Sequence, residues 1–112
     1  MALRRSYTAT VERNVIWKGE FASEPYESAW ASEAIFFVRA LDVSPDFSGG
    51  ARVQISADGI HWADEGTVFD LPTAVDAVTF GRVTHFGGWL RLRGSLKDGT
   101  SITVLVSLAL KE

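Results

Sequence analysis

The fold class is decided near the end of the chain, where residues 102–110 read ITVLVSLAL. Every even-numbered position is large and apolar, whereas the odd-numbered positions include the polar residues Thr103 and Ser107. Alternation with a period of two is typical of a β-strand that has one face on a core and one face on solvent. We therefore expect a half-buried strand in this stretch.

The same alternation is found elsewhere in the chain. Leu90 and Leu92 alternate with Trp89, Arg91 and Arg93, and a shorter example is Arg52–Ser56. The run Ala34–Leu41 differs because both of its faces are apolar, which predicts a central strand that is covered on both sides or faces a partner subunit. Weaker patterns predict further strands at Ser6–Glu12, Val15–Phe21, Thr67–Leu71 and Ala77–Val83.

Turn residues separate these runs. Pro25, Pro45 and Pro72 lie between them, as do the pairs Gly49-Gly50 and Gly87-Gly88. Some seven to nine short strands with this spacing predict an all-β protein, an antiparallel β-sandwich of jelly-roll type. We expect residues 1–112 to form a single domain, in which residues 1–14 are an arm or an edge strand that contacts a neighbour.

Two Asp-Gly pairs predict hairpins. At Asp98-Gly99, a three-residue loop with a left-handed Gly99 would pair Leu90 with Val106, Leu92 with Val104 and Gly94 with Ile102. Such a hairpin would place Trp89, Arg91, Arg93, Thr103, Leu105 and Ser107 on one outer face.

The second hairpin lies in the segment Ser56–Trp62. A two-residue turn at Asp58-Gly59 would set Ile55 opposite Trp62, with both side chains inward and Trp62 as an apolar plug. The Asp58 carboxylate is expected to accept backbone N–H groups of the turn.

Composition narrows the classes of function. The chain has 11 basic and 14 acidic residues, for a net charge of −3, which argues against binding to nucleic acid or to an anionic membrane. It contains no Cys, so a thiol nucleophile and a Cys-ligated zinc are excluded. The start of the chain carries no pattern of a signal peptide, and no apolar run approaches the ~20 residues of a membrane span.

No pattern points to catalysis or to a metal. His61 and His85 have no zinc-ligand spacing, and four scattered aspartates (Asp42, Asp46, Asp58 and Asp64) match no calcium loop. No nucleophile elbow or phosphate-binding glycine loop is present. We expect a protein that is not an enzyme and that uses no cofactor.

Trp89, Arg91 and Arg93 form the most conspicuous candidate for a binding surface. A tryptophan beside two guanidinium groups could stack on a sugar ring and hydrogen-bond to its hydroxyls. The same residues could anchor a protein interface, since Trp and Arg are favoured there. A third interpretation is that the N-terminal segment of the chain covers Trp89.

Two families share these features. The segment 53–62 (VQISADGIHW) followed by 88–93 (GWLRLR) resembles discoidin-type, galactose-binding-like jelly rolls. The order of an apolar strand, a Ser-containing loop, Ser-x-Asp-Gly-x-x-Trp, Gly-x-hydrophobic-Arg and a final hairpin, from Ala34 to Glu112, resembles small bacteriophage structural proteins. The first resemblance implies a carbohydrate-binding module, and the second implies a virion subunit that decorates a capsid.

We favour the second interpretation and expect a structural assembly module. Its partners would be copies of itself and a capsid-like protein lattice, with a sugar ligand as the alternative, and it would be assembled in the host cytoplasm. The mechanism would be burial of apolar strand faces and aromatic anchors. The candidate contact residues are Tyr7, Trp17, Phe37, Trp89, Arg91 and Arg93.

Overall fold

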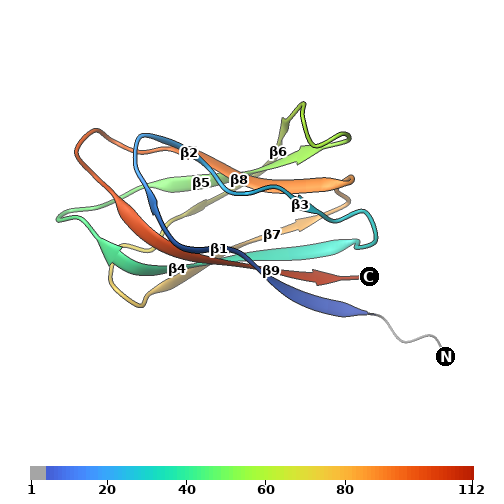
Figure 1. Cartoon of the computed structure of the whole chain (residues 1–112), viewed down its shortest axis with the longest axis horizontal. Helices are drawn as coiled ribbons and strands as arrows, with labels where there is room; N and C mark the ends of the chain where they lie inside the picture. Colours follow the sequence, from blue (N-terminus) through green and yellow to red (C-terminus); the bar gives the residue numbers. More distant parts are fainter. Residues whose placement is uncertain (1–4) are drawn as a thin grey trace.

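The computed structural model describes residues 5–112, which form two antiparallel β-sheets packed face to face (Figure 1). Sheet A contains, in spatial order, β1 (Ser6–Trp17), β9 (Ile102–Lys111), β4 (Glu33–Val43) and β7 (Val78–Thr84). Sheet B contains β2 (Glu20–Ala22), β8 (Trp89–Ser95), β5 (Gly50–Ser56) and β6 (Ala63–Asp70), and the short β3 (Tyr26–Glu27) also pairs with β8.

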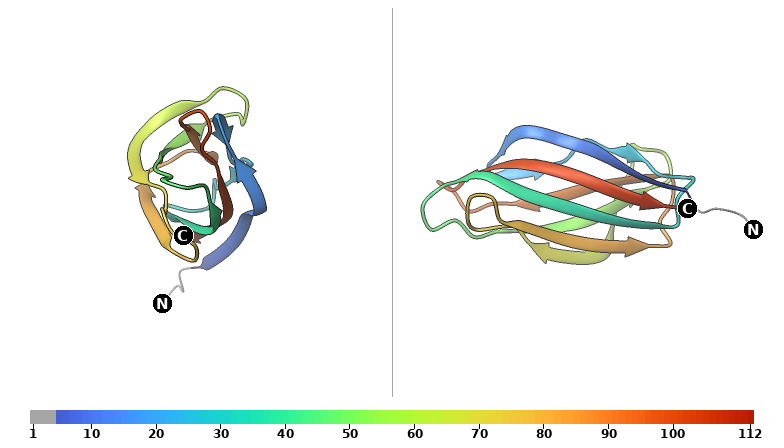
Figure 2. Two further views of the ribbon diagram at one scale, coloured as in Figure 1. Left: turned by 90° about the vertical axis from the view of Figure 1, so that its left-hand side faces the viewer. Right: turned by 90° about the horizontal axis from the view of Figure 1, so that it is seen from below.

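The strand order identifies the sandwich as a jelly roll. Apart from β3, eight strands form two four-stranded layers, and sequential strands repeatedly cross from one layer to the other. The two views of Figure 2 show the layers end-on and the long strands of sheet A side by side. The predicted fold class, an antiparallel β-sandwich of seven to nine strands, is confirmed.

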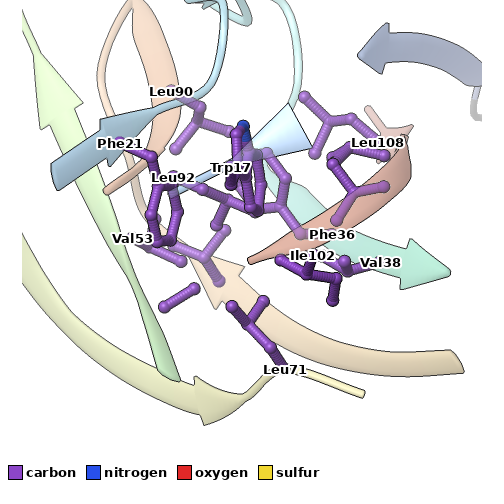
Figure 3. Close-up of a cluster of buried hydrophobic side chains, with 14 of the residues drawn as sticks. Trp17, Phe21, Phe36, Val38, Val53, Leu71, Leu90, Leu92, Ile102 and Leu108 are labelled. Carbon is purple, nitrogen blue, oxygen red and sulfur yellow. The ribbon is translucent and has the colours of Figure 1, made fainter. Parts of the chain in front are cut away.

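The core lies between the sheets and is filled by the alternating residues of both. Phe36 and Val38 of β4 face Leu90 and Leu92 of β8 (Figure 3). None of these four side chains has exposed surface, and neither has Val106 of β9. Burying each such side chain stabilises the fold by about 1.5–3 kcal/mol relative to exposure. The alternation in the sequence thus records which face of each strand lies in this layer.

The strand that is apolar on both faces occupies the interior of sheet A. β4 pairs with β9 on one side and with β7 on the other, so it is a central strand as predicted. Its inward residues are buried, but Ile35 and Phe37 on its outer face are half-exposed. Within the described chain no second layer covers that outer face, so the expectation of cover on both sides is wrong for the chain alone.

The predicted hairpin between β8 and β9 is wrong. β8 pairs with β5 in sheet B, whereas β9 pairs with β1 and β4 in sheet A, so Leu90–Val106, Leu92–Val104 and Gly94–Ile102 are not cross-strand partners. The connection is also longer than the expected three residues, because β8 ends at Ser95 and β9 begins at Ile102. Within it, Gly99 is left-handed as predicted, with φ +82°, and Thr100 N–H donates to the Lys97 carbonyl at 3.1 Å. Both strands bury their even-numbered residues because they cover the same core from opposite sides.

The N-terminal segment is part of the chain's own sheet. β1 is an edge strand that pairs with β9, with register shifts between Thr10 and Glu12 and between Arg13 and Val15. It merges most of the two strands predicted at 6–12 and 15–21, and residues 20–22 form β2. The described part of the expected arm is therefore an edge strand, and residues 1–4 of that prediction lie outside the described residues. Such bulges twist an edge strand and hinder strand addition by another chain.

Candidate functional site

The predicted contact residues lie in four separate places. Trp89, Arg91 and Arg93 project from β8 onto the outer face of sheet B. Phe37 lies on the outer face of sheet A, and Tyr7 lies on the edge strand β1 with 56% of its surface exposed. Only the three residues of β8 therefore share one surface.

Trp17 belongs to the core and not to a contact surface. Only 3% of its surface is exposed, and its ring stacks on that of Phe21 with centroids 4.2 Å apart (Figure 3). The stacked pair links the end of β1 to β2, where the chain crosses from sheet A to sheet B. Trp17 is consequently removed from the set of candidate contact residues.

A polar network covers the outer face of sheet B. Arg91 Nε donates to Gln54 Oε1 at 2.8 Å, and Gln54 Nε2 donates to Asp64 Oδ1 at 2.8 Å. Arg52 Nε donates to the same Asp64 oxygen at 3.0 Å. The hydrogen bond from Gln54, followed by that from Arg52, lowers the pKa of Asp64. The network joins β5, β6 and β8 and gives the face a fixed arrangement of charges.

Trp62 is part of this outer face, which corrects its predicted position in the core. Its ring lies under the Arg91 guanidinium, whose Cζ is 4.3 Å from the ring centroid. The register explains the difference, because Ile55 pairs with Ala63 instead of Trp62. The loop between β5 and β6 is longer than the expected two residues, and the added length turns Trp62 to the other side of the sheet.

The hydrogen bonds of Asp58 account for that longer loop. Asp58 Oδ1 accepts the N–H groups of Ile60 at 2.9 Å and His61 at 2.8 Å, as predicted for a turn aspartate. Ser56 Oγ donates to Asp58 Oδ1 and accepts from the N–H of Gly59 at 2.8 Å. Reaching both Ile60 and His61 requires that the chain wrap around the carboxylate.

Trp89 is half-buried beneath this loop. A Cβ atom built on Gly59 would lie 3.1 Å from Trp89 Cε2, and Gly59 has φ +79°. Glycine is therefore required here both for its conformation and for its close approach to the indole. The segment that covers Trp89 is the loop after β5, at the end of the sandwich where the chain terminates, and not the N-terminal segment (Figure 1).

Acid is expected to weaken this loop through Asp58. The His61 and Ile60 N–H groups and the His61 ring hold the pKa of Asp58 well below its ordinary value of 3.8. A depressed carboxyl pKa stabilises the fold above that ordinary value, and the contribution is lost as the pH falls toward the folded-state pKa. Asp58→Asn should thus lower the urea midpoint at neutral pH, and the difference from wild type should shrink below about pH 4.

Asp98→Asn provides the matched control for this titration. Asp98 lies in the other Asp-Gly turn, and within residues 5–112 its carboxylate accepts no hydrogen bond. Its replacement should change the urea midpoint little at any pH. A difference between Asp58→Asn and wild type that is equally large at pH 7 and pH 2.5 would show that geometry, and not charge, is responsible.

Neither family models nor curated proteins give a match to this sequence.

The outer face of sheet A holds residues that the sequence analysis did not select. Phe37 of β4 lies beside Phe80 of β7 with ring centroids 6.2 Å apart, and Arg82 Cζ lies 4.9 Å above the Phe80 ring. Phe80 is 46% exposed, and Val78 is 52% exposed. The alternation of Val78, Phe80 and Arg82 in the sequence places these residues on one face of a strand. Without the fold, it did not indicate whether that face points to the core or to the outside.

Residues 5–112 contain no group of three His, Asp or Glu side chains placed to hold a metal ion. The same part of the chain has no helix with the length and apolar character of a transmembrane span.

Proposed function

We propose that this chain is a non-enzymatic structural assembly module that self-associates through the outer face of sheet A. The observation that carries the proposal is the inverted polarity of the first half of β7. There Val78 and Phe80 face outward while Thr79 and Gly81 face the interior, whereas Val83 in the second half is buried in the core. Thr79 Oγ1 is buried without a hydrogen-bond partner among the described residues. A strand in a lone sandwich normally has the opposite arrangement.

The neighbouring strands extend this apolar surface. Phe37 and Ile35 of β4 and Leu105 of β9 are half-exposed on the same face. Charged residues surround them, with Arg39 paired to Asp76 at 2.7 Å on one side and Arg82 over Phe80 on the other. An apolar centre with a polar rim is the usual anatomy of a protein interface.

The size of the face fits contact with a second copy. Its four strands are 7 to 12 residues long. With strand spacing of about 4.8 Å and a rise of about 3.3 Å per residue, the face covers about 600 Å². Two such faces would bury about 1,200 Å², which is at the lower end of stable interfaces. A two-fold contact over this face would include Phe37 on the internal strand β4 and Phe80 on the edge strand β7 of both copies.

The proposal extends to a capsid-like lattice in a virion as the setting of this assembly. The order of motifs from Ala34 to Glu112 resembles small bacteriophage structural proteins. An all-β sandwich with an apolar outer face suits that role, because it can add to an existing protein surface without chemistry or cofactor. In that setting the second copy or the lattice covers the same face.

Analytical ultracentrifugation tests self-association. The wild-type chain is expected to increase in mass with concentration up to about 1 mM, and Phe80→Glu should weaken the association at least tenfold. Ile60→Glu is the matched control, because Ile60 is 74% exposed in the loop after β5, away from sheet A. A wild-type protein that stays monomeric throughout, or equal effects of both substitutions, would overturn the proposal.

A further inference from the structure

Three arginines gather on the outer face of sheet B, opposite to the face proposed for self-association. Arg52 and Arg93 are direct cross-strand partners, and Arg91 projects from the same face of β8. Like charges placed opposite each other in a sheet are unfavourable unless something compensates them. Asp64 lies 3.0 Å from Arg52, and Glu20 lies 3.4 Å from Arg93. These two carboxylates compensate two of the three arginines.

Of these three arginines, Arg91 is the one that has no carboxylate partner within residues 5–112. Its Nε donates to Gln54 Oε1, and its guanidinium lies over the Trp62 ring. Its two terminal nitrogens form no hydrogen bond with any described residue. Burial, followed by the charges of Arg93 and Arg52, lowers the pKa of Arg91, so this cation lies in a locally positive field.

The surroundings of Arg91 hold its guanidinium in place before any ligand arrives. Gln54 donates its amide nitrogen to Asp64, which fixes the amide oxygen toward Arg91. Trp62 supports the plane of the guanidinium from one side. A fixed planar fork with free N–H donors is the geometry that binds a carboxylate through two parallel hydrogen bonds. Because the fork is already ordered, binding would cost little side-chain entropy.

A hollow of about 460 Å³ lies on the same face, and it begins at Arg93, two residues along β8 from Arg91, which does not itself line it. Arg52 and Arg93 border it, Val68 adds an apolar wall, and the bare backbone of Gly50 forms part of its floor. Asp70 also lines the hollow, so an anion is favoured on the arginine side and disfavoured on the Asp70 side. An apolar wall next to an anion site suits a peptide segment better than a free inorganic anion.

We propose that this face, with Arg91 at its centre, binds an acidic side chain of a partner protein segment. The structure favours a peptide over a sugar because one face of the Trp62 ring is occupied by Arg91, and Trp89 is in contact with Gly59. The hydrogen-bonding fork, and not an open aromatic ring, is therefore the recognition element. The inference is independent of self-association, since it uses the opposite face of the sandwich.

NMR titration with a blocked hexaglutamate peptide tests this site. The Nε–H signal of Arg91 and the indole N–H signal of Trp62 should shift and saturate with hexaglutamate and remain unchanged with hexaglutamine. Arg91→Lys should weaken binding about tenfold, because lysine loses the bidentate fork. Arg39→Lys, at an arginine on the opposite face that pairs with Asp76, should leave binding unchanged.

A second variant blocks the fork without removing the arginine. Gln54→Glu would place a carboxylate 2.8 Å from Arg91 Nε, at the position of the present amide oxygen, and should abolish peptide binding. Failure of hexaglutamate to saturate these signals by about 10 mM, or binding unaffected by both Arg91→Lys and Gln54→Glu, would overturn the proposal. Tighter, Arg91-dependent binding of oligogalacturonate would also overturn it, by identifying an acidic sugar as the ligand. All of these measurements report on residues of sheet B. Failure of this proposal would therefore leave the ultracentrifugation test of self-association through sheet A unaffected.

Discussion

Phe36→Ala is expected to lower the free energy of unfolding by about 3–5 kcal/mol. Phe36 has no exposed surface and lies at the centre of the core between the two sheets (Figure 3). Removing its ring leaves a cavity that neighbours from two rigid sheets cannot fill. The loss of stability therefore includes both the transfer free energy of the removed ring and the cost of the cavity. For a chain of this size the melting temperature should fall by about 10–20 °C. Thermal and urea unfolding, followed by tryptophan fluorescence, measure this loss.

Phe37→Ala is the matched control, since it removes the same side chain from the next residue. Phe37 is half-exposed on the outer face of sheet A, and its principal aromatic neighbour is Phe80 at 6.2 Å. We expect its replacement to cost about 1–2 kcal/mol in the monomer. Equal losses for the two variants would show that the outer face of sheet A is as closely packed as the core, which would contradict the described burial.

The second large effect is expected from Gly94→Ala on β8. A Cβ at this position would lie 2.5 Å from Phe21 Cζ and 2.7 Å from the Gly50 carbonyl oxygen. The Phe21 ring is itself stacked on Trp17, and the carbonyl belongs to the neighbouring strand β5, so neither can move away freely. Overpacking of this kind costs about 1–3 kcal/mol, and the upper end is expected because backbone is involved.

Gly88→Ala separates overpacking from the general cost of replacing glycine. Gly88 precedes the same strand, and a Cβ there would meet nothing closer than the Ala57 carbonyl oxygen at 3.8 Å. Its replacement should change stability by less than about 0.5 kcal/mol. Urea unfolding of both variants gives the comparison, and a loss for Gly94→Ala no greater than that for Gly88→Ala would contradict the close contacts described for β8.

The sequence predicted the positions of some candidate contact residues correctly and those of others wrongly. Trp89, Arg91 and Arg93 share an outer face, as their alternation predicted. Trp17 also lies in a strand of mixed character, but its position in the core depends on the stacked Phe21, which the sequence pattern does not reveal. Trp62 was assigned to the wrong side because the register is shifted by one residue, with Ile55 opposite Ala63 instead of Trp62, and such a shift moves every side chain to the other face.

The alternating pattern alone was sufficient to assign the class of fold and the inward residues of β8 and β9. This is possible because successive side chains of a strand point to opposite faces, so local sequence reports burial directly. The neighbours of each strand were not determined in this way. Leu92 and Val104 are both fully buried, yet they belong to different sheets, because strand pairing depends on contacts between segments distant in the chain. Only the tertiary structure distinguished the outer face of sheet A from the arginine face of sheet B. A strand with one apolar face can bury that face equally well as part of either sheet, so its sequence does not tell to which sheet it belongs.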